Sequence, residues 1–176
     1  MMMNEYHFYD TSSLLMRASN LFDIEENIII STITLQELEN IKSSNDKEPA
    51  VKMAARHILN KLRDHPKAYQ VLVYSDEEEI LAPIRKMRLP INNDTRILGS
   101  AIYYDKNIHP DETIFYTNDL SLAAIANLFF GDDSIRSISE EQEYDYSGYK
   151  EIIMNDKEMA DFYSHLENNP YNLFIN

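Results

Sequence analysis

The 176-residue sequence predicts an α/β fold built on a parallel sheet of about five strands. Short apolar runs of the β type alternate along the chain with helical segments, which is the pattern of βαβ units. One of these runs, NIIIS at residues 27–31, is nearly all apolar and rich in β-branched residues, as expected for a strand buried on both faces of a parallel sheet. In addition, Asp10 and Asp119 each come shortly after a β-type run and precede a helical one. Ligand-binding residues of open parallel sheets lie at such positions.

The expected strands and helices alternate in chain order. The strands are residues 5–9 (EYHFY), 27–31 (NIIIS), 69–74 (YQVLVY), 112–117 (ETIFYT) and 134–138 (SIRSI). Helices are expected at residues 12–18, from Thr34 onward, and at 49–63, 76–82, 94–105 and 120–129. This alternation favours parallel strands joined by helical crossovers.

Most of the expected helices begin or end at a residue type that is common at helix ends. Ser12 or Ser13 can cap the first helix. Thr34 caps the next one, and Glu37 stands three residues further on, at the spacing of a capping box. The remaining signals are Pro49 at a helix start, Asn92 or Asn93 as an N-cap, and Gly131 as a C-cap.

Four carboxylates stand at strand–helix or loop–helix junctions of the expected fold: Asp10, Glu37, Asp94 and Asp119. Glu37 and Asp94 fall in the first turns of two expected helices, and we expect all four acids to share one crevice. Such acids repel one another unless a cation neutralises them. Mg²⁺ and Mn²⁺ take oxygen ligands and act on phosphodiesters. The competing interpretation is local, because each acid is also a favourable residue in a turn or at a helix N-terminus.

Composition and charge restrict the class of protein. The chain has no cysteine, which excludes disulfides and thiolate zinc sites, and no apolar run approaches the roughly 20 residues of a membrane helix. We therefore expect a soluble, cytoplasmic protein with no membrane partner. The formal net charge of −14 argues against a broad electrostatic footprint for nucleic acid, although residues 42–67 hold seven basic and three acidic residues. RNA is neither required nor excluded as a partner.

Basic residues in and near that stretch are candidates for contact with RNA. Lys52, Arg56 and Arg63 share one face of the expected helix at residues 49–63. A plain solvated face is the competing explanation for these three. Arg96 lies two residues after Asp94. A phosphate contact or a salt bridge is compatible with the sequence, and a plain surface role is the favoured interpretation.

The pattern of the sequence changes near residue 139. We expect a first domain at residues 1–139 and an acidic, tyrosine-rich extension at residues 140–176. The extension would include a strand at residues 149–154 and a helix at residues 156–167. It would either pack on the first domain or lead into a segment that this chain does not contain. The sequence leaves a homo-oligomer open.

Three regions of the chain resemble the PIN domain family. They are YDTSSLL, ITLQELENI, and NNDTRILGSA followed by YTNDLSLAAIA. The pairing of N-D-x-R-I-L with a later T-x-D-x-x-L is most similar to the PIN module that precedes PhoH-type ATPases, and SGYKEI resembles the segment that follows that module. The resemblance spans roughly residues 5–151. None of the three glycines stands in a G-x-x-x-x-G-K-[ST] loop, so the ATPase module would be a partner absent from this chain.

This resemblance implies a Rossmann-like, three-layer α/β/α fold and metal-dependent hydrolysis of single-stranded RNA. The acidic site of the family falls on Asp10, Glu37, Asp94 and Asp119. These residues would be catalytic and would hold Mg²⁺ or Mn²⁺, with one ion between the three aspartates and a second toward Glu37. Ser12 falls where the family often has a polar residue that touches the first acid or the metal. Thr117 takes the small-hydroxyl position before the last acid. The products would carry a 3′-hydroxyl and a 5′-phosphate.

Other classes of function stay open. A catalytically inactive PIN-like module that binds RNA or a protein partner fits the charge of −14 and the acidic extension. A flap- or 5′-exonuclease-like DNA nuclease would usually bring more acids and a longer DNA-gripping region. A phosphoacceptor receiver domain needs a pair of acids after the first strand, whereas only Asp10 stands there.

Overall fold

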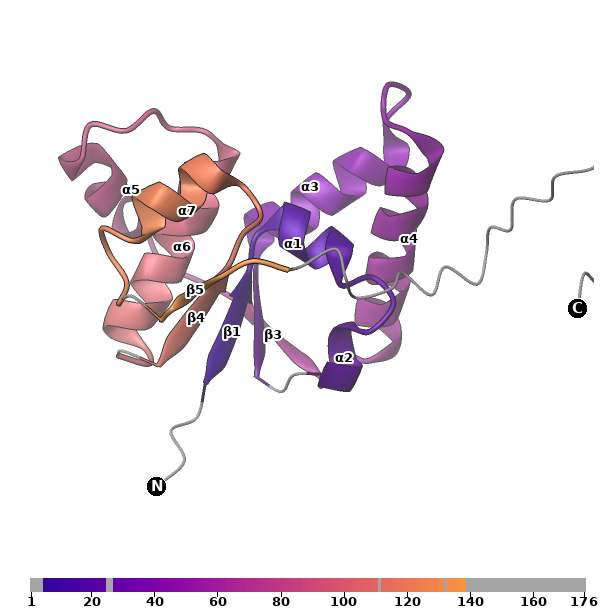
Figure 1. Ribbon diagram of the computed structural model, residues 1–176, viewed down its shortest axis with the longest axis horizontal. Helices are drawn as coiled ribbons and strands as arrows, with labels where there is room; N and C mark the ends of the chain where they lie inside the picture. Colours follow the sequence, from indigo (N-terminus) through magenta and orange to yellow (C-terminus); the bar gives the residue numbers. More distant parts are fainter. Residues whose placement is uncertain (1–4, 25–26, 111, 132, 139–176) are drawn as a thin grey trace, which may run out of the picture. The chain divides into compact units, whose positions relative to one another are not determined.

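The computed structural model describes residues 5–24, 27–110, 112–131 and 133–138 (Figure 1). The chain divides into two units, Met1–Tyr144 and Asp145–Asn176, and every described residue belongs to the first. The extension at residues 140–176, with its predicted strand at 149–154 and helix at 156–167, lies outside the described residues. The account below therefore concerns the first unit.

A parallel sheet forms the centre of this unit. Its strands are β1 (Tyr6–Tyr9), β2 (Ile28–Ser31), β3 (Tyr69–Leu72), β4 (Thr113–Tyr116) and β5 (Ile135–Arg136). They lie in the order β3-β2-β1-β4-β5, and every neighbouring pair is parallel. The predicted α/β fold with a parallel sheet of about five strands is therefore confirmed.

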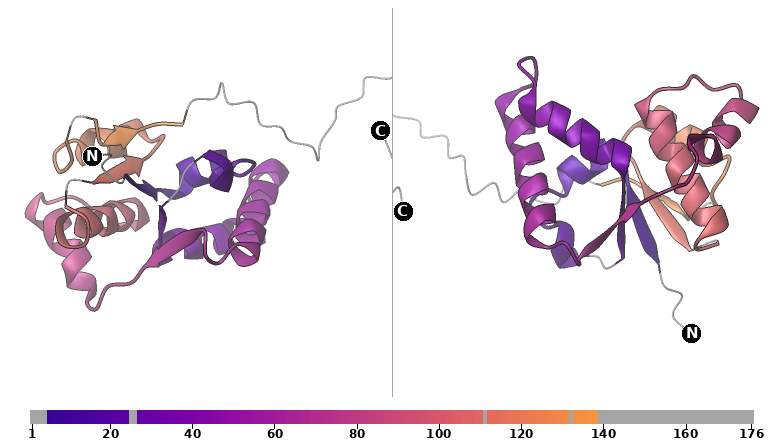
Figure 2. Two further views of the ribbon diagram at one scale, coloured as in Figure 1. Left: turned by 90° about the horizontal axis from the view of Figure 1, so that it is seen from below. Right: turned by 180° about the vertical axis from the view of Figure 1, so that it is seen from behind.

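Helices cover both faces of the sheet (Figure 1 and Figure 2). The described helices are α1 (Thr11–Met16), α2 (Leu21–Ile24), α3 (Thr32–Ser43), α4 (Pro49–Asp64), α5 (Glu77–Lys86), α6 (Asn93–Asn107) and α7 (Leu120–Ala126). Helices α1 to α4 pack on one face, and α5 to α7 pack on the other. The fold is thus the expected three-layer α/β/α arrangement. Within the described ranges, no helix combines the length and apolarity that crossing a membrane requires.

Two apolar clusters arise because successive side chains of a strand point to opposite faces of the sheet. In β2, Ile28 and Ile30 pack with α1 to α4, whereas Ile29 packs with α5 to α7. In β4, Phe115 likewise joins the α5–α7 layer and Tyr116 the other one. The three isoleucines are at most 1% exposed. This two-sided burial explains why the β2 sequence is apolar at nearly every position.

The order of the strands creates a switch point next to β1. The chain proceeds from β1 to β2 and β3 on one side, and then crosses back to place β4 and β5 on the other side. Ligand sites of open parallel sheets lie outside the carboxyl ends of the strands at such a point. Here those ends belong to β1 and β4, which are followed by Asp10 and Asp119.

Two of the predicted helix starts were wrong. Asp10, not Ser12 or Ser13, caps α1, because its side chain accepts a hydrogen bond from the Ser13 N–H. Ser31, not Thr34, caps α3. The start of α3 moves back to the end of β2, so Glu37 is the sixth residue of the helix rather than part of a capping box. Glu37 is thereby free of any capping function.

Helix α5 is longer than the predicted segment at residues 76–82. It runs to Lys86, although Pro83 lies inside it and cannot donate a backbone hydrogen bond. Ile80 and Ile84 lie on opposite sides of Pro83 in the sequence and are both completely buried against α6. Their burial keeps the last turn helical.

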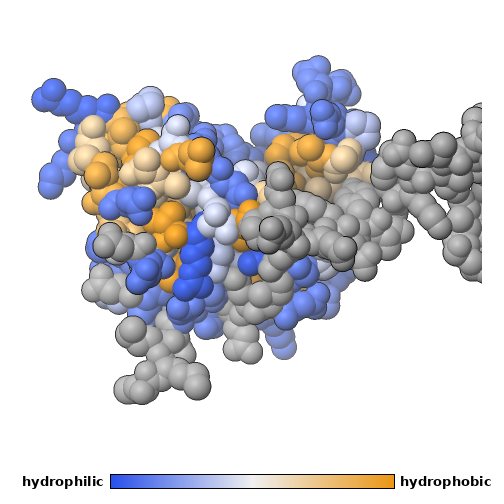
Figure 3. Space-filling model, viewed as in Figure 1, coloured by the Kyte–Doolittle hydropathy of each residue, from blue (hydrophilic) through white to orange (hydrophobic). Residues whose placement is uncertain are grey.

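Helix α7 is shorter than the predicted segment at residues 120–129, and α2 was not predicted. α7 ends at Ala126 with Asn127 as its C-cap, so Gly131 is not the cap residue. The apolar run continues past the helix end, but Leu128 is 63% exposed and does not join the core. Figure 3 shows apolar side chains gathered on the surface over α7, where Leu120 is also exposed.

Gly99 provides a test of how closely α5 and α6 pack. A Cβ atom at this position would lie 2.1 Å from the Ile80 carbonyl oxygen, which belongs to the backbone of α5. We expect Gly99→Ala to lower the free energy of unfolding by about 1–3 kcal/mol, the usual cost of overpacking a core. Urea denaturation monitored by circular dichroism measures this change.

The matched control is Gly131→Ala. A Cβ atom there would meet only the Ser134 Oγ, at 3.7 Å, and Gly131 has no positive φ. Its free energy of unfolding should stay the same or rise slightly, because alanine restricts the unfolded chain. Equal urea midpoints for Gly99→Ala and the wild type would contradict the packing described here.

Candidate metal centre

The crevice is the name used for the region around Asp10, Glu37, Asp94 and Asp119 at the carboxyl ends of β1 and β4. Asp10 is the most enclosed of these acids, with 5% of its surface exposed. Its Oδ1 accepts hydrogen bonds from the Ser13 N–H at 2.7 Å and from the Ser13 hydroxyl at 2.6 Å. The Ser12 hydroxyl lies 3.0 Å from Oδ1 and 3.1 Å from Oδ2. Ser12 therefore touches the first acid, as the sequence suggested. Ser13, which sequence reasoning overlooked as a partner of Asp10, fixes the carboxylate more tightly.

Asp119 lies at the carboxyl end of β4 and caps α7. Its Oδ1 accepts hydrogen bonds from the Ser121 and Leu122 N–H groups, at 2.7 and 3.0 Å. The Asp119 N–H donates to the Thr117 Oγ1 at 3.1 Å, and Thr117 is almost completely buried. Thr117 thus holds the turn that presents Asp119, and the carboxylate itself stays exposed.

Asn118 is a further residue of this turn, to which the sequence alone assigned no chemical role. Its Nδ2 donates to the Ile138 carbonyl at 2.8 Å, and its Oδ1 accepts from the Ile138 N–H at 2.9 Å. A side-chain amide that bonds both backbone groups of one residue imitates a strand partner. Asn118 therefore ties the turn before α7 to the segment that follows β5. No local sequence signal identifies this pairing.

Glu37 reaches the crevice from α3 and is partly buried. Thr11 Oγ1 donates a hydrogen bond to its Oε2, and Asn93 Nδ2 donates to its Oε1 at 2.9 Å. Thr11 is the first residue of α1, and Asn93 is the first residue of α6. The Glu37 carboxylate therefore joins three helices.

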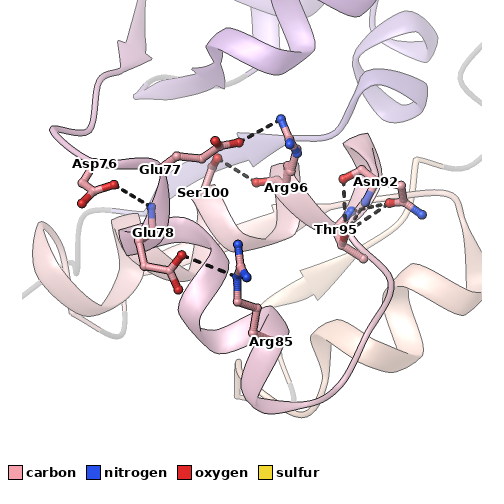
Figure 4. Close-up of polar contacts among 8 residues, drawn as sticks. All are labelled: Asp76, Glu77, Glu78, Arg85, Asn92, Thr95, Arg96 and Ser100. Carbon is pink, nitrogen blue, oxygen red and sulfur yellow. Dashed lines mark hydrogen bonds and ion pairs between the residues drawn. The ribbon is translucent and has the colours of Figure 1, made fainter.

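Asp94 stands in the first turn of α6, where a capping box fixes the helix start. The Thr95 N–H donates to the Asn92 Oδ1 at 2.9 Å, and the Asn92 N–H donates to the Thr95 Oγ1 at 3.0 Å (Figure 4). Partial burial raises the pKa of Asp94, and the negative charges of Glu37, Asp119 and Asp10 raise it further. The structure thus places Glu37, Asp119 and Asp10 within electrostatic range of Asp94.

The separation of these acids is wider than in an assembled metal site. Among the described residues, no three Asp, Glu or His side chains converge closely enough to hold a metal ion as they stand. The kind of donor nevertheless suits Mg²⁺ or Mn²⁺, because all four groups offer carboxylate oxygens. Asp94 is exposed, so its side chain has room to rotate, whereas the Asp119 carboxylate is held as the cap of α7. A cation in this crevice would have to draw the carboxylates together.

The structure places Arg96 against an acidic residue of α5. Its guanidinium lies 2.9 Å from the Glu77 carboxylate, next to a second pair between Arg85 and Glu78 at 3.5 Å (Figure 4). Of the explanations that the sequence left open, the salt bridge is the one that the structure shows. Exposed pairs of this kind contribute at most about 1 kcal/mol, so the pair does not preclude other contacts of Arg96.

The other three basic candidates lie on α4. Lys52 is partly buried, whereas Arg56 and Arg63 are exposed. Arg63 donates from Nε to Asp64 at 3.0 Å. Helix α4 packs against α1 and α3, the helices that carry Thr11 and Glu37. Contact of these basic residues with RNA stays a prediction.

The raised pKa of Asp94 predicts how stability depends on pH. An acid whose pKa is higher in the folded than in the unfolded state loses stability as pH rises from its ordinary value, 3.8, through the raised one. We therefore expect Asp94→Asn to melt at a higher temperature than the wild type near pH 7 in chelator. The difference should vanish as pH falls to about 3.8, where the wild-type carboxyl is protonated.

Differential scanning fluorimetry across this pH range measures the effect. Asp46→Asn is the control, because it makes the same change in net charge at an exposed loop position outside the crevice. A melting temperature of Asp94→Asn that equals that of Asp46→Asn at every pH would show that the crevice exerts no repulsion on Asp94.

Comparison with known proteins agrees with this geometry. A family model described as PIN domain matches residues 8–129, a range that includes all four acids. No curated protein matches the chain. Members of the PIN domain family are typically metal-dependent nucleases. Because the match extends over more than half of the sequence and the sheet has the parallel topology of that fold, the chain belongs to the PIN domain family.

Proposed function

We propose that this protein is a metal-dependent ribonuclease that hydrolyses phosphodiester bonds of single-stranded RNA in the crevice beside β1 and β4. The observation that carries the proposal is the parallel pairing of β1 with β4, which places Asp10 and Asp119 at one edge of the sheet. Burial, together with the charges of Glu37, Asp119 and Asp10, also raises the pKa of Asp94. Membership of the PIN domain family indicates the class of reaction. The four carboxylates near the switch point of the parallel sheet would provide oxygen ligands for the metal ion.

Mg²⁺ or Mn²⁺ would be held by the three aspartates, with Glu37 facing a second ion when the substrate adds phosphate oxygens. A bound ion of this kind lowers the pKa of a water molecule and stabilises charge on phosphoryl oxygens. Asp10 is the fixed ligand of the set, because Ser12 and Ser13 hold its carboxylate. Asp119 is held as the cap of α7, and Asp94, which is exposed, would complete the set by rotating toward the other two aspartates. In-line attack would leave a 3′-hydroxyl and a 5′-phosphate.

Residues around the acids hold them in place for metal binding. Ser13 and Thr117 are buried, and each fixes the strand end that carries an acid. Preorganised ligands lose less entropy on metal binding, which favours an occupied site. On α4, Arg56 and Arg63 are exposed and offer positive charge to an RNA backbone.

A finer assignment rests on the sequence motifs. The N-D-x-R-I-L segment at α6 and the T-x-D-x-x-L segment at α7 favour the PIN modules that occur with PhoH-type ATPases. We propose accordingly that the protein acts in the cytoplasm and that an ATPase module, absent from this chain, is its partner. Copurification with such an ATPase from cells tests this assignment.

The second candidate is a catalytically inactive PIN module that binds RNA or a protein partner. One observation favours it: no three potential ligands among the described residues lie close enough to hold an ion as they stand. The net charge of −14 also opposes RNA binding over a broad surface. Divalent metal separates the two candidates, since only the nuclease requires it.

Removing a proposed ligand should abolish hydrolysis and leave the fold intact. We expect Asp10→Asn and Asp119→Asn each to reduce cleavage of a fluorescent single-stranded RNA by at least about 100-fold, because a catalytic metal would be misplaced. Asparagine also caps helices, so α1 and α7 should persist. Initial rates with Mg²⁺ and with Mn²⁺ measure the loss, and a chelator should stop the wild-type reaction.

Glu78→Gln is the control for this experiment, since Glu78 is an exposed acid of α5 outside the crevice. It should cleave RNA at the wild-type rate. A folded, metal-bound wild type that cleaves no RNA would establish the inactive module instead. Undiminished cleavage by Asp10→Asn would show that the hydrolysis arises elsewhere.

Metal binding should also raise thermal stability, independently of any substrate. A cation that binds only the folded state stabilises it by mass action, by about 2.7 kcal/mol at a concentration 100 times its Kd. We expect millimolar Mn²⁺ to raise the wild-type melting temperature and to raise that of Asp10→Asn much less. A wild-type melting temperature that does not respond to Mn²⁺ would argue against the metal centre.

A further inference from the structure

Two neutral side chains hold the carboxylate of Glu37. Thr11 donates to one oxygen, and Asn93 donates to the other at 2.9 Å. Each donor is also the direct neighbour of a proposed metal ligand, since Thr11 follows Asp10 and Asn93 precedes Asp94. These contacts connect Glu37 to both sides of the crevice.

The orientation of Glu37 depends on these two donors. Its backbone lies within α3, and the side chain must extend through several rotatable bonds to reach the crevice. Fixing such a side chain costs up to about 2 kcal/mol of rotamer entropy, which hydrogen bonds to both oxygens help to offset. Thr11 is buried at the start of α1, so its hydroxyl is itself well fixed.

We propose that Thr11 and Asn93 are positioning residues of the metal centre, which orient the Glu37 carboxylate and thereby set the affinity of the crevice for a divalent cation. This inference rests on the proposed function in taking the four acids as metal ligands. Neither donor carries a charge, so both orient Glu37 without neutralising it. A lysine in either place would compete with the cation.

The expected size of the effect follows from the behaviour of outer-shell residues in metal sites. Hydrogen bonds to ligating side chains are typically worth 10- to 100-fold in metal affinity. Thr11 and Asn93 come from different helices, so both helix starts contribute to the orientation of one carboxylate. Loss of either donor should therefore weaken metal binding by a factor of about 10 or more.

The experiment compares Mn²⁺ binding to the full chain by isothermal titration calorimetry in the absence of RNA. Thr11→Val keeps the shape of the side chain and removes the donor, whereas Thr11→Ser keeps the donor. We expect Thr11→Val and Asn93→Ala to raise the Kd for Mn²⁺ by about 10- to 100-fold. Thr11→Ser should stay within about threefold of the wild type, as should Asn60→Ala on the exposed face of α4.

A purely structural role would not produce this pattern, because melting temperatures in chelator report on folding alone. If Asn93→Ala fails to fold, the Thr11→Val and Thr11→Ser pair decides the matter. Equal Kd values for Thr11→Val and Thr11→Ser would overturn the proposal, and so would a wild type that binds no Mn²⁺. A wild type that binds Mn²⁺ without cleaving RNA would refute the ribonuclease while the affinities still test the positioning residues.

Discussion

The parallel pairing of β1 with β4 is the constraint on which the candidate site depends. The two strands align residue for residue up to Tyr9 and Tyr116, whose rings stack with centroids 4.5 Å apart. Beyond that pair, the Asp10 N–H donates to the Tyr116 carbonyl at 3.0 Å, so the alignment extends to the acid itself. Asp10 and the turn that carries Asp119 therefore leave the sheet at the same edge. The relative placement of these two acids follows from this alignment.

Asp10 and Asp119 can act both as helix caps and as residues of the candidate site, so these two interpretations do not compete. Asp10 and Asp119 both cap helices, and a cap of this kind contributes about 1 kcal/mol to stability. The same backbone N–H groups that satisfy the cap also fix the direction of the carboxylate. Capping offsets part of the repulsion among like charges, which adds to the effect of burial in raising the pKa of Asp94. A helix cap is in this sense one means by which the fold keeps Asp10 and Asp119 in place near other acids.

The sequence was sufficient to predict the sheet, its parallel sense and the edge at which Asp10 and Asp119 lie, because a strand followed by an acid and a helix is a local pattern. The N-cap of α3 could not be predicted in this way. Ser31 and Thr34 are both good caps, and only the length of β2 decides between them. The partners of Glu37 were likewise out of reach, since Thr11 lies 26 positions and Asn93 56 positions away in the sequence.

The division of the core into two helical layers has a consequence for the folding of the chain during its synthesis. The α1–α4 layer contributes Asp10 and Glu37, and the α5–α7 layer contributes Asp94 and Asp119. A chain emerging from the ribosome carries only half of these acids until its second layer has been synthesised. The last acid takes its place only when β4 inserts beside β1. The set of four acids is therefore complete only after the whole sheet has formed.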